Sequence, residues 1–279
     1  MLLLKQLFRF YVNASIHVAL SVVALYVLNA KTLNIPLNFN LVGFLFFATI
    51  VCYNFVKYGV EADKYLIVAK PSHKPIQIFS FISFAAALWF LVNLGRLVLP
   101  LLIVLTLISV FYVVPLSASS KNLRSVLGLK VIIVAFEWTG FTVLLPLLEV
   151  FQPFNLQELW VSLSTFLLVI VLMIPFEIRD LKYDKPELRT LPQRFGIRKT
   201  KAIGYALCGL YLLFSLLAMG WNLGSYAFSI LTTILLMFAL YKTKEVQSAY
   251  FASLGIEALP IFFLVLKLGI DYVALELFF

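Results

Sequence analysis

The chain has 279 residues, of which 63% are hydrophobic, and its mean hydropathy is +1.02. Soluble domains contain about 45–50% apolar residues, so this composition excludes a single soluble globular domain. The formal net charge of +9 does not indicate nucleic-acid binding, because the basic residues follow a topological pattern described below.

Apolar runs of roughly 16–20 residues recur along the chain, and this is the length that a helix needs to cross about 30 Å of hydrocarbon. The runs are continuous rather than alternating, which favours helices over the strands of a barrel. We therefore predict an all-α polytopic membrane protein, with about nine transmembrane helices in a single domain over residues 1–279. The predicted spans are about 10–28, 39–56, 76–92, 97–114, 131–148, 160–178, 203–219, 224–241 and 254–270.

The basic residues are distributed unequally between the two sides of such a bundle. Of the 22 lysines and arginines, all but Lys31, Arg96 and Lys267 fall on the side of the N-terminus. The positive-inside rule places that side in the cytoplasm. The two long loops, about 57–75 and 179–202, lie there too, so we expect any chemistry at the cytoplasmic face of a bacterial inner membrane.

The most informative segment is IPFEIRDLKYDKPELRTLPQRFG, from Ile174 to Gly196, at the end of the sixth predicted span. Asp180 and Asp184 are one helical turn apart, and Glu177 falls on the same face. The sequence thus predicts a stripe of up to three carboxylates at the membrane surface.

Carboxylates this close repel one another unless a cation lies between them, and their hard oxygens suit Mg²⁺. The basic residues that follow, which include Arg189 and Arg194, would suit phosphate oxygens. This pattern predicts a site for Mg²⁺ and a diphosphate. The alternative is a solvated helix end whose acids pair with the neighbouring basic side chains of Arg179, Lys182 and Lys185.

Asp180-x-x-x-Asp184 followed by RTLPQRFG resembles the second aspartate motif of the UbiA superfamily of intramembrane prenyltransferases. The resemblance implies a UbiA-like helical bundle within the lipid bilayer. It also implies that Asp180 and Asp184 are catalytic and bind Mg²⁺, with Glu177 as a further metal ligand. The implied substrates are a polyprenyl diphosphate and an acceptor, commonly an aromatic ring or quinone precursor.

The first aspartate motif of that family should lie at the end of the second span, where this chain has YNFVKYGVEADKY from Tyr53. Asn54 matches the motif and is a candidate diphosphate-binding residue, but Tyr58 and Ala62 occupy the positions of the two expected carboxylates. Glu61 lies about 20° from the face of Asn54 on a continuous helix and is a candidate metal ligand. Lys57 is a candidate for neutralising diphosphate charge in place of one metal ion.

Tyr112, Lys121 and Arg124 resemble a further tyrosine-and-base segment of the family and are candidate diphosphate-binding residues. The positive-inside rule explains Lys121 and Arg124 equally well. Glu137 and Glu257 are carboxylates within predicted spans, where either could serve an acceptor or a structural pair.

We therefore expect Mg²⁺-dependent transfer of a prenyl group from a polyprenyl diphosphate to an acceptor in the membrane. The missing carboxylates of the first motif favour an alternative, a catalytically inactive homologue that binds a prenyl or lipid ligand. A small-molecule transporter is a third possibility, although the chain lacks paired Gly- or Pro-broken spans in two halves.

Overall fold

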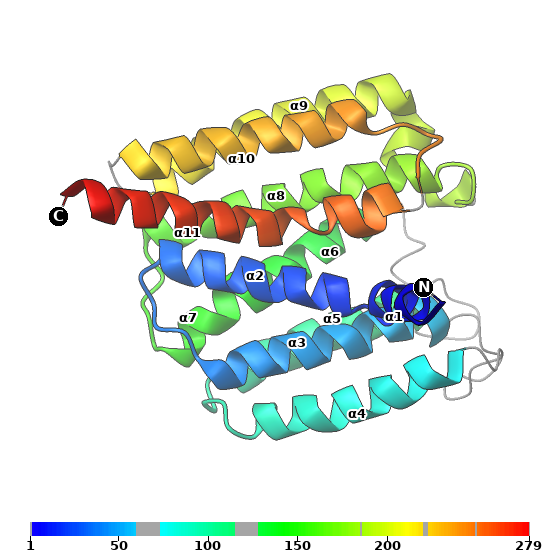
Figure 1. Cartoon of the computed structure of the whole chain (residues 1–279), viewed down its shortest axis with the longest axis horizontal. Helices are drawn as coiled ribbons and strands as arrows, with labels where there is room; N and C mark the ends of the chain where they lie inside the picture. The colour runs from blue at the N-terminus through cyan, green and yellow to red at the C-terminus, as the bar shows by residue number, and fades with distance from the viewer. Residues whose placement is uncertain are drawn as a thin grey trace.

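The computed structural model describes residues 2–59, 73–114, 128–184, 186–219, 223–248 and 250–278. These residues form a bundle of helices, most of which run side by side along one direction, with no strand in the described ranges (Figure 1). The all-α class predicted from the sequence is confirmed.

The first apolar run is bent. Helices α1 (Leu2–Asn13) and α2 (Ile16–Thr32) meet at an angle of 57°. Ser15 has a φ of 61° at this bend, so the backbone leaves the right-handed helical conformation there. The predicted span beginning near residue 10 therefore begins at Ile16, and α1 lies across the end of the bundle (Figure 1).

The next helices complete one half of the bundle. Helix α3 (Phe39–Asn54) starts after Asn38, whose side chain accepts the N–H groups of Asn40 and Leu41. It continues into the π-helical turn η1 (Phe55–Gly59). The remaining elements of this half are α4 (Lys74–Leu91), α5 (Val98–Val113), α6 (Leu129–Thr139), the π-helical turn η4 (Gly140–Leu144) and α7 (Leu145–Glu149).

The second half contains α8 (Leu156–Asp180), the short 3₁₀ turn η5 (Pro186–Leu188), α9 (Leu191–Ala218), α10 (Leu223–Lys242), the π-helical turn η6 (Phe251–Ile256) and α11 (Leu259–Phe278). Helix α9 begins at Leu191, whereas the sequence predicted a loop up to about residue 202. Gly196 interrupts it with φ 74° and ψ 161°, a conformation essentially restricted to glycine. A short helical segment precedes this break, and the seventh predicted apolar run follows it.

The count of nine spans is not confirmed. Seven helical segments of the described chain are long and apolar enough to cross a membrane, and the bent α1–α2 pair makes an eighth if it is one span. The remaining predicted span corresponds to α5, which is apolar but has only 16 residues. The chain is an integral membrane protein with several apolar helices.

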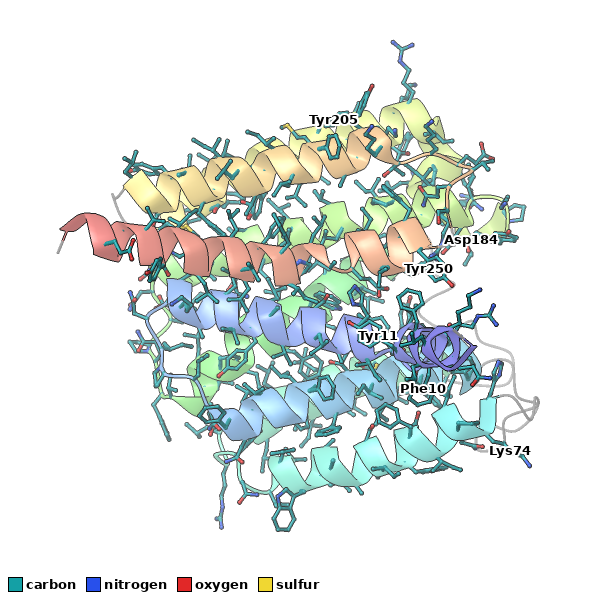
Figure 2. The ribbon with its side chains drawn as sticks, in the orientation of Figure 1. Phe10, Tyr11, Lys74, Asp184, Tyr205 and Tyr250 are labelled. Atoms are coloured by element: carbon teal, nitrogen blue, oxygen red, sulfur yellow. The ribbon has the colours of Figure 1, made fainter. Side chains whose placement is uncertain are left out.

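Neighbouring helices of the bundle pack against one another in pairs. Helix α2 packs against α3 on one side and α11 on the other, and α8 packs against α6 and α9. One buried apolar cluster centres on α8, with members from α9, α10 and α11, and a second joins α2, α3, α5 and α7. Asp184, Tyr11 and Lys74 lie toward the end of the bundle that carries the N-terminus (Figure 2). The C-terminus lies at the opposite end (Figure 1).

Candidate functional site

The acidic segment lies at the end of α8. Asp180 is the last residue of this helix, and the N–H of Asp184 donates to the carbonyl of Asp180 at 2.8 Å. One further helix-like turn therefore carries Asp184 beyond the helix end. No proline lies between Pro175 and Pro186, so no residue of this turn lacks an N–H donor.

Lys130, in the first turn of α6, lies between two of the carboxylates. Its Nζ is 2.9 Å from Oε1 of Glu177 and 3.7 Å from Oδ2 of Asp184. The three side chains are largely buried, at 2% exposure for Glu177, 12% for Lys130 and 13% for Asp184. Their charges are therefore screened less by solvent than those of a surface ion pair.

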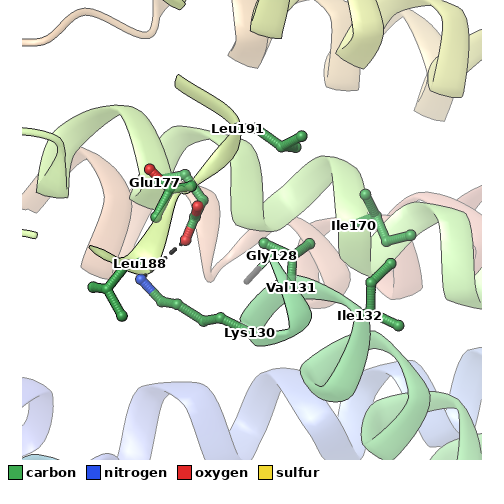
Figure 3. Close-up of a pocket in the computed structure, with 9 residues that line it drawn as sticks. Gly128, Lys130, Val131, Ile132, Ile170, Glu177, Leu188 and Leu191 are labelled. Atoms are coloured by element: carbon green, nitrogen blue, oxygen red, sulfur yellow. Dashed lines mark ion pairs between the residues drawn. The ribbon is translucent and has the colours of Figure 1, made fainter. Parts of the chain in front are cut away.

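Glu177 and Lys130 line a cavity of about 90 Å³ between α6, α8 and the start of α9 (Figure 3). The rest of its lining is mainly apolar, with Thr190 as a further polar residue. Oε1 of Glu177 and Oδ2 of Asp184 are buried. Within the part of the chain that is described, the Lys130 ammonium is the polar partner of both oxygens.

Asp180 has a different partner. Its carboxylate accepts two hydrogen bonds from the neighbouring Arg179, at 2.7 Å from Nε and 3.1 Å from the terminal nitrogen. The same guanidinium lies over the ring of Phe176 at 5.1 Å. The structure thus brings Glu177 and Asp184 together around Lys130 and leaves Asp180 in a separate pair.

Asn54 lies at the end of α3, where it contacts the bend of the first apolar run. Its side-chain oxygen accepts from Ser15 Oγ at 2.8 Å, and its Nδ2 donates to the carbonyl of Ala14 at 3.3 Å and to Ser80 Oγ at 2.9 Å. Lys57, although exposed, donates from Nζ to the same Ser15 hydroxyl at 3.0 Å. Asn54 and Lys57 therefore share one polar cluster.

Glu257, at the start of the last apolar run, faces this cluster from the other side. Its backbone carbonyl accepts a hydrogen bond from Ser21, and the carbonyl of Leu254 is 2.9 Å from Nε2 of His17. These contacts join η6 and α11 to α2. The carboxylate of Glu257 lies within the electrostatic range of Lys57 and Arg179, so charged groups of η1, of α8 and of the turn between η6 and α11 converge here.

The other candidate residues have different surroundings. Arg189 and Arg194 are exposed, and the guanidinium of Arg194 lies 5.2 Å from the centre of the Phe195 ring. Tyr112 is buried near the end of α5. Glu61, Lys121 and Arg124 lie outside the described residues.

Sequence reasoning missed the role of Lys130, which it counted only as a topological charge. No local pattern joins Lys130 to Glu177, because their contact depends on how α6 packs against α8. It also missed Ser15, whose only sequence signal is its position in a weakly apolar stretch. Arg179 was recognised as a possible partner of the acids, and the structure pairs it with Asp180.

The carboxylates suit a hard divalent cation, but the structure brings only two of them, Glu177 and Asp184, together around Lys130. Within the described ranges, no group of three His, Cys, Asp or Glu side chains is arranged to hold a metal ion. Mg²⁺ is commonly held by one or two carboxylates, with water and substrate phosphates completing its shell. The two buried oxygens of Glu177 and Asp184 that contact Lys130 meet that requirement.

No protein family model matches the sequence, and no curated protein matches it either. The structure, in contrast, is similar to a UbiA homologue from Archaeoglobus fulgidus solved with bound Cd²⁺. The TM-score is 0.62 over 92% of this chain and 98% of that one, at 13% sequence identity. The chain has the UbiA fold. A second structure with this fold, a digeranylgeranylglyceryl phosphate synthase described in membranes, matches with a TM-score of 0.55 and 15% identity over 96% of this chain and 98% of that one.

The acidic segment at the end of α8 and Asn54 at the end of α3 come from the two halves of the bundle. Both helices end toward the side that carries the N-terminus (Figure 1).

Proposed function

We propose that this protein transfers a prenyl group from a polyprenyl diphosphate to an acceptor within the membrane, in a reaction that depends on Mg²⁺. The observation that carries the proposal is the buried cluster of Glu177, Asp184 and Lys130 beside a cavity at one end of the UbiA fold. Acidic and basic groups together suit a metal-bound diphosphate, whereas a purely structural pair needs only one of each.

Glu177 and Asp184 would hold Mg²⁺, with Asp180 and Glu61 as further ligands, and the bound ion would supply charge neutralisation of the diphosphate leaving group. Lys57 and Arg179 would attract phosphate oxygens at the mouth of the bundle. Arg189, Arg194, Tyr112, Lys121 and Arg124 complete the proposed diphosphate contacts. The apolar helix faces would exclude water from the reactive allylic carbon.

We place the site at the cytoplasmic face of a bacterial inner membrane, because the basic residues cluster on this side. The acceptor class we propose is an aromatic or quinone-precursor ring. Such a ring partitions into the apolar part of a bundle while its polar groups stay near the interface.

A second candidate function is a homologue that binds a prenyl or lipid ligand without catalysis. It is favoured by the pairing of the acids, since Asp180 is bonded to Arg179 and the other two contact Lys130. It is also favoured by Asn54, whose side-chain oxygen and nitrogen are bonded to Ser15, Ala14 and Ser80.

The test is binding of a non-hydrolysable geranylgeranyl diphosphate analogue to the purified protein, with and without Mg²⁺. We expect Mg²⁺-dependent binding in the wild type and its loss in Asp184→Asn. Glu245→Gln is the matched control, because this carboxylate lies after α10 and has no ion pair with Lys130. Equal binding in wild type and Asp184→Asn would refute the site, and binding without release of diphosphate from the natural substrate would favour the second candidate.

A further inference from the structure

Lys130 brings one positive charge to two negative ones in a largely buried position. Its ammonium is closer to Glu177, at 2.9 Å, than to Asp184, at 3.7 Å. The side chain reaches this place from α6, across the cavity that it lines (Figure 3). Lys130 therefore occupies the position between the carboxylates that a metal ion would need.

The two carboxylate oxygens that contact Lys130 have few polar partners. Among the described residues, Oε1 of Glu177 and Oδ2 of Asp184 share one polar partner, the Lys130 ammonium, although Glu177 is almost fully buried. A buried carboxylate oxygen with so few polar partners is stabilised when a further cation or hydrogen-bond donor binds to it. The adjoining cavity of about 90 Å³ is large enough to hold water. An ammonium group can move within that space.

We propose that Lys130 is a tethered counter-ion that exchanges partners. Without substrate it neutralises Glu177 and Asp184. When a divalent cation and a diphosphate bind together, the cation takes the two carboxylates and the Lys130 ammonium turns to the diphosphate. This inference rests on the proposed function, because it concerns the same two carboxylates.

The exchange predicts that metal and diphosphate bind cooperatively. A divalent cation alone must compete with the ammonium for the same oxygens, and the two cations repel each other. A diphosphate carries enough negative charge to bind both the divalent cation and the Lys130 ammonium. Because binding free energies are reciprocal, each ligand should then increase the affinity for the other by the same factor.

The experiment measures Mn²⁺ binding to purified protein by the electron paramagnetic resonance signal of free Mn²⁺, with and without inorganic pyrophosphate. We expect Lys130→Met to bind Mn²⁺ alone about tenfold or more tightly than the wild type. We also expect pyrophosphate to increase Mn²⁺ affinity by a smaller factor in Lys130→Met than in the wild type. Lys130→Arg keeps the charge and should resemble the wild type.

Lys242→Met is the matched control, because this lysine lies over the rings of Phe238 and Tyr241 and contacts no carboxylate in the described structure. Equal Mn²⁺ affinity in the wild type, Lys130→Met and Lys130→Gln would overturn the counter-ion role. The second substitution keeps the test decisive if the first variant does not fold. Failure of the proposed function is recognised separately, by unchanged Mn²⁺ and pyrophosphate binding in Glu177→Gln and Asp184→Asn.

Discussion

The side-chain oxygen of Asn54 accepts a hydrogen bond from Ser15 Oγ at 2.8 Å, although the two residues are 39 positions apart in the chain. Ser15 lies at the bend between α1 and α2, and Asn54 is the last residue of α3. The residue that matches the first aspartate motif in the sequence thus holds the bend of the first apolar run. This contact gives Asn54 a structural role that can be measured apart from any activity.

Asn54→Ala should destabilise the protein by about 1–3 kcal/mol, because it removes three hydrogen bonds at a buried position. The measurement is unfolding by titration with sodium dodecyl sulfate in mixed micelles. Asn93→Ala is the control, since this exposed asparagine makes only a local bond to Trp89. Equal stability of the two variants would show that the bend does not depend on Asn54.

Gly196→Ala should cost about 1–3 kcal/mol, because the backbone at Gly196 has a positive φ and an extended ψ that an L side chain rarely adopts. A Cβ at this position would meet no atom within 4 Å, so the cost comes from the backbone alone. Gly209→Ala, later in α9 and also in open space, should leave stability unchanged or raise it. A stable Gly196→Ala with an unchanged α9 would contradict this account of the break.

Gly43→Ala should separate α3 from α4. A Cβ on Gly43 would lie 2.6 Å from ring atoms of Phe90, which is closer than real contacts allow. Moving an aromatic ring within a packed interface costs about 1–3 kcal/mol. The same titration in mixed micelles measures this cost, with Gly269→Ala as the control because its added Cβ meets nothing. A loss no greater than that of the control would mean that Phe90 moves freely.

Lys57→Met should weaken binding of the geranylgeranyl diphosphate analogue about tenfold or more, because a charge-assisted hydrogen bond contributes about 1.5–3 kcal/mol. The effect should shrink at high salt, since Lys57 is exposed. Binding is measured by calorimetry at two ionic strengths. Lys74→Met, at the start of α4 on the same end of the bundle, controls for general positive charge. Equal losses in both variants would assign the effect to net charge rather than to the Ser15–Lys57 cluster.

The fold class could be predicted from the sequence because long apolar runs predict helices that span the lipid bilayer. It missed the bend at Ser15 and the early start of α9, since both depend on local backbone conformations within or beside apolar runs. It located Glu177, Asp180 and Asp184 by helical spacing. It could not assign their partners, because Lys130 reaches Glu177 through the packing of α6 on α8, and such long-range contacts leave no periodic signal.

Helix α2 packs against α11, although the two helices are far apart in the sequence. His17 and Ser21 of α2 bond the carbonyls of Leu254 and Glu257, which precede α11. During synthesis, these partners leave the ribosome after α2 and after all the helices between α2 and α11. Until they insert, the polar side chains of α2 face either lipid or a substitute partner, at a cost in free energy. The contact between α2 and α11 is therefore made late in assembly, and a chain arrested before residue 251 should be a substrate for membrane quality control.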